Sequence, residues 1–297
     1  MMATSAWVAE LLCYNFAYMK HEVLIVKAGG VTEAFSREKL LGSLSRAGAD
    51  PQIAEKIASH IDSEVRDGMS THDIYSHAFY LLHRQQKPLA LKYSLRRSLM
   101  DLGPSGFPFE KFIGEIWKKK GFHVEVDKVV RGYCTEHEVD VIAWNENKLV
   151  MTEAKFHNQL GVKSDLKVAL YVKARYEDLQ KMTFNYGKER KLDEGWLVTN
   201  TKFTSSAIEY AQCQGLRMVG WNYPAKGNLQ DMIEDSGLHP LTCLTTLNVI
   251  EKRNLMDKGL VLCNDLESQV SSLEQIGIHR DRIGPIIEES KMLCPVV

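Results

Sequence analysis

Several features are missing from this sequence, and each absence narrows the possibilities. No run of about 18 uncharged apolar residues occurs, which excludes a membrane-spanning helix. The segment from Met1 to Met19 lacks the basic start of a signal peptide and carries Glu10 in its apolar stretch, so secretion is not expected. The six cysteines form no C-x-x-C pair, which argues against a zinc knuckle and a disulfide framework. We therefore expect reduced thiols and a cytoplasmic protein.

The chain also lacks a charge imbalance, with 37 Lys and Arg against 38 Asp and Glu. Any attraction to nucleic acid must therefore come from a local patch. With 297 residues, of which 44% are hydrophobic, the sequence is globular and long enough for two domains and a small third one.

The N-terminal part predicts a β-hairpin followed by helices. A β-branched run after His21 leads into a turn at Gly29-Gly30 and a second short apolar segment. Four helices are expected to follow, over about 37–47, from Asp50-Pro51, from Thr71 and after Pro88. The stretch Gly103-Pro104-Ser105-Gly106 has the composition of a linker.

This arrangement resembles the ATP-cone, a small regulatory nucleotide-binding domain, over about residues 22–102. The matching features are Lys27 and Gly30 in the hairpin, Phe35-Ser-Arg-Glu-Lys-Leu, Arg46-Ala-Gly-Ala, Gly68-Met-Ser-Thr and Ala90-Leu-Lys-Tyr-Ser-Leu-Arg. The resemblance implies binding of an adenine nucleotide, ATP or dATP, as a regulator. The chain departs from the family at Ala28-Gly29, where an Arg-Asp pair is usual.

By this resemblance, Lys27 and Lys39 would meet the nucleotide phosphates, and the backbone at Gly29 and Gly30 would approach them closely. A lysine supplies a mobile point charge, and glycine has no Cβ to block the contact. The alternative is that both lysines are solvated surface residues of a protein-interaction domain.

The central part opens with an amphipathic helix and continues as strands. Phe109, Phe112, Ile113, Ile116 and Trp117 predict a helix over 108–120. Strands are expected over 122–126, 137–144 and 148–156, with Val139, Val141 and Ala143 on one face and Glu138, Asp140 and Ile142 on the other. In the last strand, Leu149, Met151, Glu153 and Lys155 lie on one side.

Two carboxylates and an ammonium group projecting together from adjacent strands are costly unless something compensates them. A divalent cation would do so, because carboxylate oxygens are the ligands that Mg²⁺ prefers. Water activated beside such an ion and a lysine can attack a phosphodiester. The pattern of Asp140, Glu153 and Lys155 is therefore consistent with metal-dependent hydrolysis, but Glu-x-Lys by itself is common, and the surrounding sequence decides.

Residues 106–223 resemble the PD-(D/E)xK nuclease core and, within it, the Mrr-type restriction endonuclease domain. The resemblance uses Gly106-x-x-Phe109-Glu-x-Phe112, Glu138-Val-Asp140-Val, Leu149-Val-Met-Thr-Glu153-Ala-Lys155 and Gly195-Trp-Leu-Val-Thr. It implies that Asp140 and Glu153 are ligands of Mg²⁺ or Mn²⁺ and that Lys155 is the catalytic lysine. Many Mrr-type domains have Gln in place of Glu153, so this chain carries the fuller carboxylate set.

Glu110 occupies the place where some members add a further acidic ligand, with a solvated helix glutamate as the equal alternative. A helix from about Ser164 to Lys181 carries more basic than acidic groups, which suits a phosphate backbone, although a solvated face explains the same residues. Residues 237–297 predict a small helical module for packing or dimerisation, with a faint resemblance to a helix-hairpin-helix as the alternative.

The expected fold class is α/β (α+β): a restriction-endonuclease-like mixed sheet flanked by helices, preceded by a mostly helical ATP-cone and followed by a helical module. The expected divisions are an extension over 1–21, the ATP-cone over 22–103, the nuclease domain over 104–235 and the module over 236–297. The predicted activity is Mg²⁺-dependent DNA cleavage, in restriction of foreign DNA or in repair, regulated by ATP or dATP. The protein is expected to form a homo-oligomer and to have no membrane partner. The alternative is a catalytically inactive, nucleotide-regulated DNA-binding protein.

Overall fold

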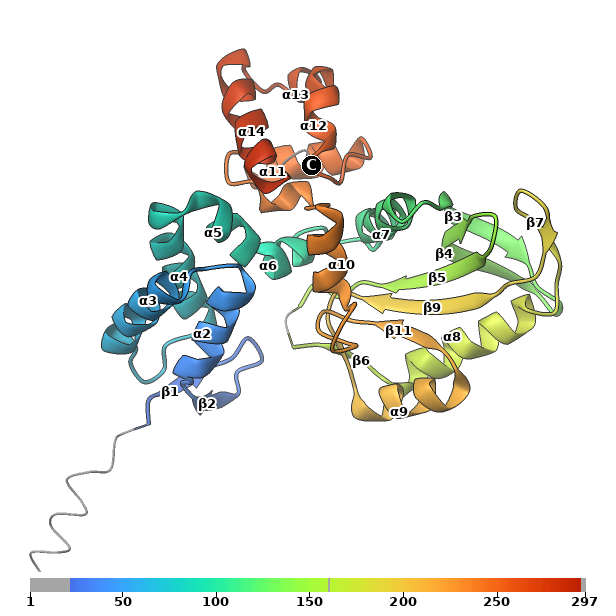
Figure 1. The fold of residues 1–297 in the computed structure, drawn as a ribbon, viewed down its shortest axis with the longest axis horizontal. Coiled ribbons are helices and arrows are strands. Elements are labelled where there is room, and N and C mark those ends of the chain that lie inside the picture. The colour runs from blue at the N-terminus through green and yellow to red at the C-terminus, as the bar shows by residue number, and fades with distance from the viewer. Residues whose placement is uncertain (1–21, 160, 295–297) are drawn as a thin grey trace, which may run out of the picture. The chain divides into compact units, whose positions relative to one another are not determined.

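The computed structural model describes residues 22–159 and 161–294, so the predicted extension over 1–21 lies outside the described residues (Figure 1). Its contacts divide the chain into two compact units, one up to Leu81 and one from Leu82 onward. The helices at 87–100 belong to the core of the second unit, and the predicted domain boundary near residue 103 stays a prediction. No helix within the described ranges is long and apolar enough to cross a membrane.

The first unit contains the predicted hairpin and the helices that pack around it. Strands β1 (Leu24–Val26) and β2 (Thr32–Ala34) pair antiparallel, which confirms the hairpin. Helices α2 (Arg37–Arg46) and α3 (Pro51–Glu64) follow, and α4 (Thr71–Gln85) begins in this unit. Ser36 caps α2 by accepting a hydrogen bond from the Lys39 amide at 3.2 Å.

The loop between α3 and α4 is bonded to the first strand of the hairpin. The Asp67 carboxylate accepts from the Leu24 amide at 2.7 Å, and the Val26 amide donates to the Met69 carbonyl at 3.0 Å. Gly68 has a φ of 80°, a conformation that glycine adopts at low cost. This loop thereby fixes the strand that leads into Lys27.

A five-stranded mixed sheet forms the middle of the second unit. Its order is β11-β9-β5-β4-β3, antiparallel from β3 to β5 and parallel from β5 through β9 to β11. The strands are β3 (His123–Arg131), β4 (Glu136–Trp144), β5 (Leu149–Lys155), β9 (Glu194–Thr199) and β11 (Arg217–Val219). A mixed sheet flanked by helices was the expected fold class, and it is confirmed.

Helices cover both faces of this sheet (Figure 1). Helix α7 (Phe107–Lys119) packs on one face with its predicted apolar residues buried, and the Trp117 indole donates to the Thr152 hydroxyl at 3.2 Å. Helices α8 (Leu166–Leu179) and α9 (Ser205–Gln214) pack on the other face. The sheet therefore separates two apolar cores.

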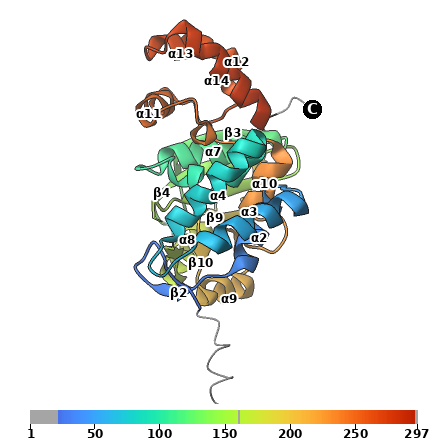
Figure 2. The same ribbon diagram turned by 90° about the vertical axis from the view of Figure 1, so that its left-hand side faces the viewer.

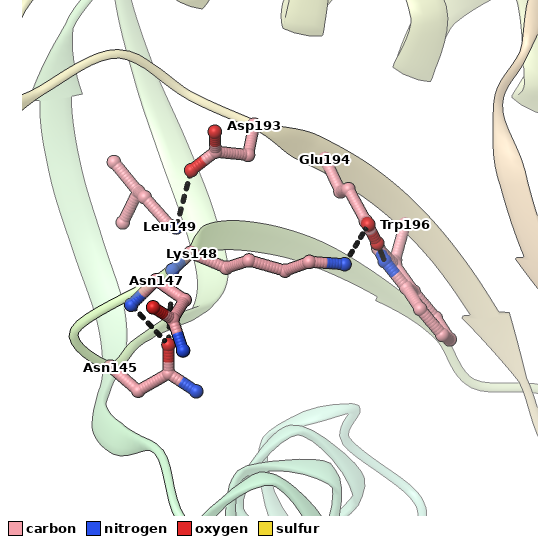
Figure 3. A network of polar contacts seen from close by, with 7 residues as sticks. All are labelled: Asn145, Asn147, Lys148, Leu149, Asp193, Glu194 and Trp196. Carbon is pink, nitrogen blue, oxygen red and sulfur yellow. Dashed lines mark hydrogen bonds and ion pairs between the residues drawn. The ribbon is translucent and has the colours of Figure 1, made fainter.

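The start of β5 is fixed to the start of β9 by polar contacts (Figure 3). The Asn145 side chain accepts from the amides of Asn147 and Lys148 in the turn before β5. Asp193 accepts from the Leu149 amide at 2.7 Å, and Lys148 pairs with Glu194 at 2.6 Å. These contacts set the parallel register that places Glu153 opposite Leu197 and Lys155 opposite Thr199.

The remaining helices complete the first of the two cores. They are α5 (Lys87–Tyr93), α6 (Leu95–Met100), α10 (Leu229–Ser236), the 3₁₀ turn η1 (Leu241–Cys243), α11 (Val249–Asp257), α12 (Asp265–Ser268), α13 (Val270–Gln275) and α14 (Arg280–Leu293). Helices α12, α13 and α14 lie together in both views (Figures 1 and 2), as expected for a helical module. Buried Glu289 accepts from the Thr246 amide at 2.8 Å and pairs with Lys87 at 3.2 Å, which joins α14 to α5.

Gly195 in β9 tests how tightly α8 packs on the sheet. A Cβ at this position would lie 2.2 Å from Cδ2 of Tyr176, a buried ring on α8 whose hydroxyl donates to the Trp196 carbonyl. We expect Gly195→Ala to lower the free energy of unfolding by about 1–3 kcal/mol, measured by urea denaturation, because the packed ring has little room to move. Gly284→Ala in α14 is the matched control, since its added methyl would meet no atom within 4 Å. An equal loss in both variants would contradict this account.

Candidate functional site

The candidate site forms where β4 and β5 separate. The two strands pair in register from Trp144 opposite Leu149 up to Val141 opposite Thr152, and the pairing stops at the next position. There the Asp140 carboxylate accepts a hydrogen bond from the Ala154 amide at 2.7 Å. A side chain thus takes the place of the next backbone bond between the strands, and the strand ends open around Asp140.

The same irregularity affects the other neighbour of β4. Its pairing with β3 is interrupted between Val126 and Lys128, where Asp127 has a φ of 53°. As a result Val139 packs in the core beneath α8 with Ile142, whereas Val141 packs beneath α7. The prediction that Val139 and Val141 share a face was wrong, because strict alternation does not continue across Asp140.

Glu153 projects toward α8 and forms an ion pair there with Arg175. The Arg175 guanidinium also donates to the Glu138 carbonyl at 2.8 Å and stacks on the Tyr171 ring, with its carbon 4.5 Å from the ring centroid. Both side chains of the pair are largely buried, with 10% of Arg175 and 15% of Glu153 exposed. Arg175 is therefore held in place by three different contacts.

Glu110 approaches the site from α7, on the opposite face of the sheet. Its carboxylate lies against Gly106, where a Cβ would come within 3.1 Å of Oε1. Burial, followed by the negative charges of Asp140 and Asp127, raises the pKa of Glu110 to about 7. The structure thus brings Glu110 into the electrostatic neighbourhood of the predicted ligands.

The other two carboxylates show the same excess of negative charge. Burial, followed by the charge of Asp140, raises the pKa of Glu153 to about 7 even though Arg175 and Lys155 oppose the shift. Burial also raises the pKa of Asp140, while the hydrogen bond from the Ala154 amide lowers it. The protein cations at this site therefore do not fully compensate its carboxylates.

Lys155 is the last residue of β5, and its side chain is exposed. It makes no ion pair with any residue that the structure describes, so its ammonium group is available to an anion. The chain directly after it is held firmly: the His157 amide donates to the buried Asn200 at 2.9 Å, and Asn200 donates to the His157 carbonyl at 2.8 Å. This pair of bonds fixes the direction in which Lys155 leaves the sheet.

The residues at this site fit a hard divalent cation by their chemistry. Asp140, Glu153 and Glu110 offer only carboxylate oxygens, which Mg²⁺ and Mn²⁺ accept, and their raised pKa values indicate a deficit of positive charge. The carboxylate oxygens of these three residues do not converge on a common position, however. Within the described ranges, the group whose three ligand atoms lie within 4.8 Å of one another is elsewhere in the chain. A cation at Glu153 would have to share its carboxylate with Arg175 or displace it.

The predicted nucleotide-binding residues lie together on the hairpin and the start of α2. Lys27 pairs with the Glu33 carboxylate at 2.5 Å, and Lys39 reaches the same oxygen at 3.3 Å. Gly30 has a φ of 77° and bonds back to the Lys27 carbonyl, and a Cβ at Gly29 would meet no atom within 4 Å. The structure therefore brings two lysines to one point beside an open glycine turn.

A surface hollow of about 590 Å³ lies elsewhere in the first unit, lined by Glu64, Arg66, Asp67, Gly68 and Met69. None of the predicted nucleotide-binding residues lines it. The end of α3 and the loop between α3 and α4 form its walls.

Comparisons with known proteins agree with the observed fold. Residues 103–222 match the family model described as restriction endonuclease, the Mrr catalytic family, which supports the predicted resemblance over 106–223. Residues 239–294 match the model described as AF1548-like, C-terminal, within the predicted module at 236–297. The second unit therefore contains a restriction-endonuclease-like domain and an AF1548-like C-terminal domain.

A full-length relative identifies the family. An uncharacterized protein of Archaeoglobus fulgidus is 34% identical over 183 residues, which cover 60% of this chain and 98% of that protein. The crystal structure of a protein of unknown function, AF1548, matches with a TM-score of 0.53 and 31% identity, covering 64% of this chain and 98% of that one. The chain belongs to this AF1548-like family.

Sequence reasoning missed the contact between Arg175 and Glu153. It treated Arg175 as one of several basic residues on a helix face. The available signal was its position: Arg175 directly precedes Tyr176 and follows Val172 by three, and both of these are buried against the sheet. An arginine at the border of a buried helix stripe is placed to meet a carboxylate of the sheet beneath it.

The raised pKa of Glu110 predicts a pH-dependent difference in stability. Folding disfavours its ionised form, since the pKa is about 7 in the folded chain against an ordinary 4.5. The contribution of Glu110 is therefore fully present below about pH 4.5 and is lost as the pH rises through about 7. We expect Glu110→Gln to become more stable relative to the unchanged protein over this interval, measured by urea denaturation at a series of pH values. Glu115→Gln on the same helix is the control, and a difference that does not vary with pH would contradict the prediction.

Proposed function

We propose that this protein is a metal-dependent DNA endonuclease in which Asp140 and Glu153 hold Mg²⁺ or Mn²⁺ and Lys155 contacts the scissile phosphate. The observation that carries the proposal is the restriction endonuclease match over 103–222, within which β4 and β5 separate at Asp140. Glu110 adds a third carboxylate from α7. Restriction of foreign DNA and DNA repair are the two roles that such cleavage would serve.

The division of labour follows from where the side chains lie. When bound, Mg²⁺ or Mn²⁺ would acidify water and offset negative charge on the phosphate. Asp140 and Glu153 would hold the ion from adjacent strands, and the exposed Lys155 ammonium would stabilise the negative charge that grows on the phosphate oxygens during hydrolysis. Asp140 also keeps the strand ends apart through its bond to Ala154, so it has both a binding and a structural part in the proposal.

The alternative function is a nuclease fold kept as a DNA-binding scaffold. The observation that favours it is the ion pair between Glu153 and Arg175, which already provides one carboxylate with a protein cation. In this alternative Arg175 would stay in place permanently, and DNA would be bound without being cut.

Plasmid nicking separates the two functions. We expect supercoiled plasmid DNA to be nicked with Mg²⁺ or Mn²⁺, and Asp140→Asn, Glu153→Gln and Lys155→Ala each to lower the rate at least about 100-fold, as loss of a group that stabilises the transition state does. DNA binding, measured by gel shift, should remain in all three variants.

The control for this experiment is Glu136→Gln, an exposed carboxylate on the same strand as Asp140, which should nick at the unchanged rate. RNA is incubated in parallel to identify the substrate. Binding of DNA without any nicking, with either metal and with or without ATP or dATP, would decide for the scaffold.

We further propose that the first unit binds ATP or dATP at Lys27 and Lys39, with the backbone at Gly29 and Gly30 close to the phosphates, and that binding shifts nuclease activity or assembly into a homo-oligomer. Two lysines against the single carboxylate of Glu33 leave one positive charge in excess at this place. A phosphate group would compete with Glu33 for both ammonium groups. Bound nucleotide would alter activity only if it favours one state of the chain over another.

Calorimetric titration with ATP and dATP tests this second proposal. We expect Lys27→Ala and Lys39→Ala each to weaken binding by about tenfold or more, because each removes a charge-assisted contact to phosphate. Lys56→Ala, an exposed lysine on α3, is the control and should bind like the unchanged chain. A full-length protein that binds neither nucleotide would assign both lysines to a protein-interaction surface.

A further inference from the structure

Two histidines and one glutamate meet in the first unit, apart from the lysines discussed above. His60 and Glu64 lie one helical turn apart on α3, and His77 reaches them from α4. The His60 Nε2 atom is 3.3 Å from one oxygen of Glu64, and the His77 Nδ1 atom is 3.3 Å from the other. One ligand atom from each residue lies within 4.8 Å of the other two.

From this geometry we infer that His60, Glu64 and His77 form a binding site for a divalent first-row transition ion of the zinc class. Two imidazole nitrogens and one carboxylate are a donor set that suits Zn²⁺, Co²⁺ or Ni²⁺ and suits Mg²⁺ and Ca²⁺ poorly. The site is distinct from the all-oxygen site proposed for the nuclease, both in its residues and in the ion it would select.

Two distances in the cluster are close to those between neighbouring ligands of a metal site. In tetrahedral zinc sites, bonds of about 2.0–2.2 Å place neighbouring ligand atoms about 3.3–3.6 Å apart. Each oxygen of Glu64 lies at this spacing from one imidazole nitrogen, Oε1 from His60 Nε2 and Oε2 from His77 Nδ1. The two imidazole rings are nearly perpendicular, at 81°, with centroids 5.2 Å apart, so they meet edge to face and can direct nitrogens to one point without stacking.

The position of the cluster in the fold also favours a cation. Glu64 is the last residue of α3, where the unpaired carbonyl groups of a helix carry partial negative charge. The three side chains are partly exposed, and Glu64 also lines the surface hollow, so an ion and its water ligands have access. With three protein ligands, one coordination position would remain for water or for a further ligand in the hollow.

A bound ion would join α3 to α4 across the loop that separates them. This loop is the segment that bonds to β1 through Asp67 and Met69, immediately before Lys27. An ion held at both ends of the loop would therefore restrict the base of the hairpin. Because the ion would bind the folded arrangement of α3, α4 and their loop and not the unfolded chain, binding should raise the melting temperature of the full-length protein.

The test is Zn²⁺ titration of the full-length protein with Mg²⁺ present in excess, together with Co²⁺ absorption in the visible range as a report on coordination. We use Asp140→Asn/Glu153→Gln as the starting chain so that the proposed nuclease site contributes little. We expect one Zn²⁺ per chain, and His60→Ala, Glu64→Gln and His77→Ala each to weaken binding by about tenfold or more. The Co²⁺ spectrum should be lost with either histidine.

The matched control is His279→Ala. His279 is also an exposed histidine beside a carboxylate, 3.1 Å from Asp281, but the pair lacks a second histidine. Zn²⁺ affinity should be unchanged in this variant, and circular dichroism checks that every variant is folded. Zn²⁺ affinity that survives both His60→Ala and His77→Ala, or a starting chain that binds no Zn²⁺, would overturn the inference and leave a cluster of surface hydrogen bonds.

Discussion

The hydrogen bond from the Ala154 amide to the Asp140 carboxylate is the contact on which the arrangement of the site depends. It occurs where the ladder between β4 and β5 stops, so it satisfies a backbone donor that the partner strand no longer reaches. Without this acceptor, the donor would be left in a partly buried place at considerable cost. The bond allows the strands to separate while the sheet stays intact, and the separation makes room for side chains from both faces.

Where the strands separate, three carboxylates lie near one another, and the cations of the chain neutralise them only in part. Asp140 stands between Glu110, from the side of α7, and Glu153, from the side of α8. Burial, together with the neighbouring negative charges, raises the pKa of each carboxyl group, and Arg175 opposes this shift at Glu153 and Asp140 without cancelling it. Arg175 and a divalent cation would thus perform the same electrostatic task at Glu153. In the proposed function, displacement of Arg175 by the cation would give a catalyst, and retention of the ion pair would give a DNA-binding scaffold.

Much of the fold could be predicted because its signals are local. The apolar spacing from Phe109 to Trp117 predicted a helix over 108–120, and α7 spans 107–119. The side of β5 that carries Glu153 also followed from alternation, since Glu153 faces α8 as Leu149 and Met151 do. Prediction failed at Val139, where alternation breaks, and at Arg175, whose partner lies 22 residues away in sequence. The division of the chain near Leu81 depends on long-range packing of α5 against α14 and of α6 against η1, which no local pattern reports.

The first unit contains two carboxylates that each contact two basic side chains, Glu33 and Glu64. The chemistry of the basic side chains determines whether each place suits an anion or a cation. At Glu33 the two groups are lysines, which donate hydrogen bonds and cannot coordinate a metal while protonated, so the surplus is positive and attracts an anion such as phosphate. At Glu64 the two groups are imidazoles, whose ring nitrogens can act as lone-pair donors, so the same count of side chains attracts a cation. The loop that follows Glu64 bonds to β1, the strand that leads into Lys27. An ion bound between α3 and α4 would order this loop and, through these two hydrogen bonds, the strand that precedes Lys27.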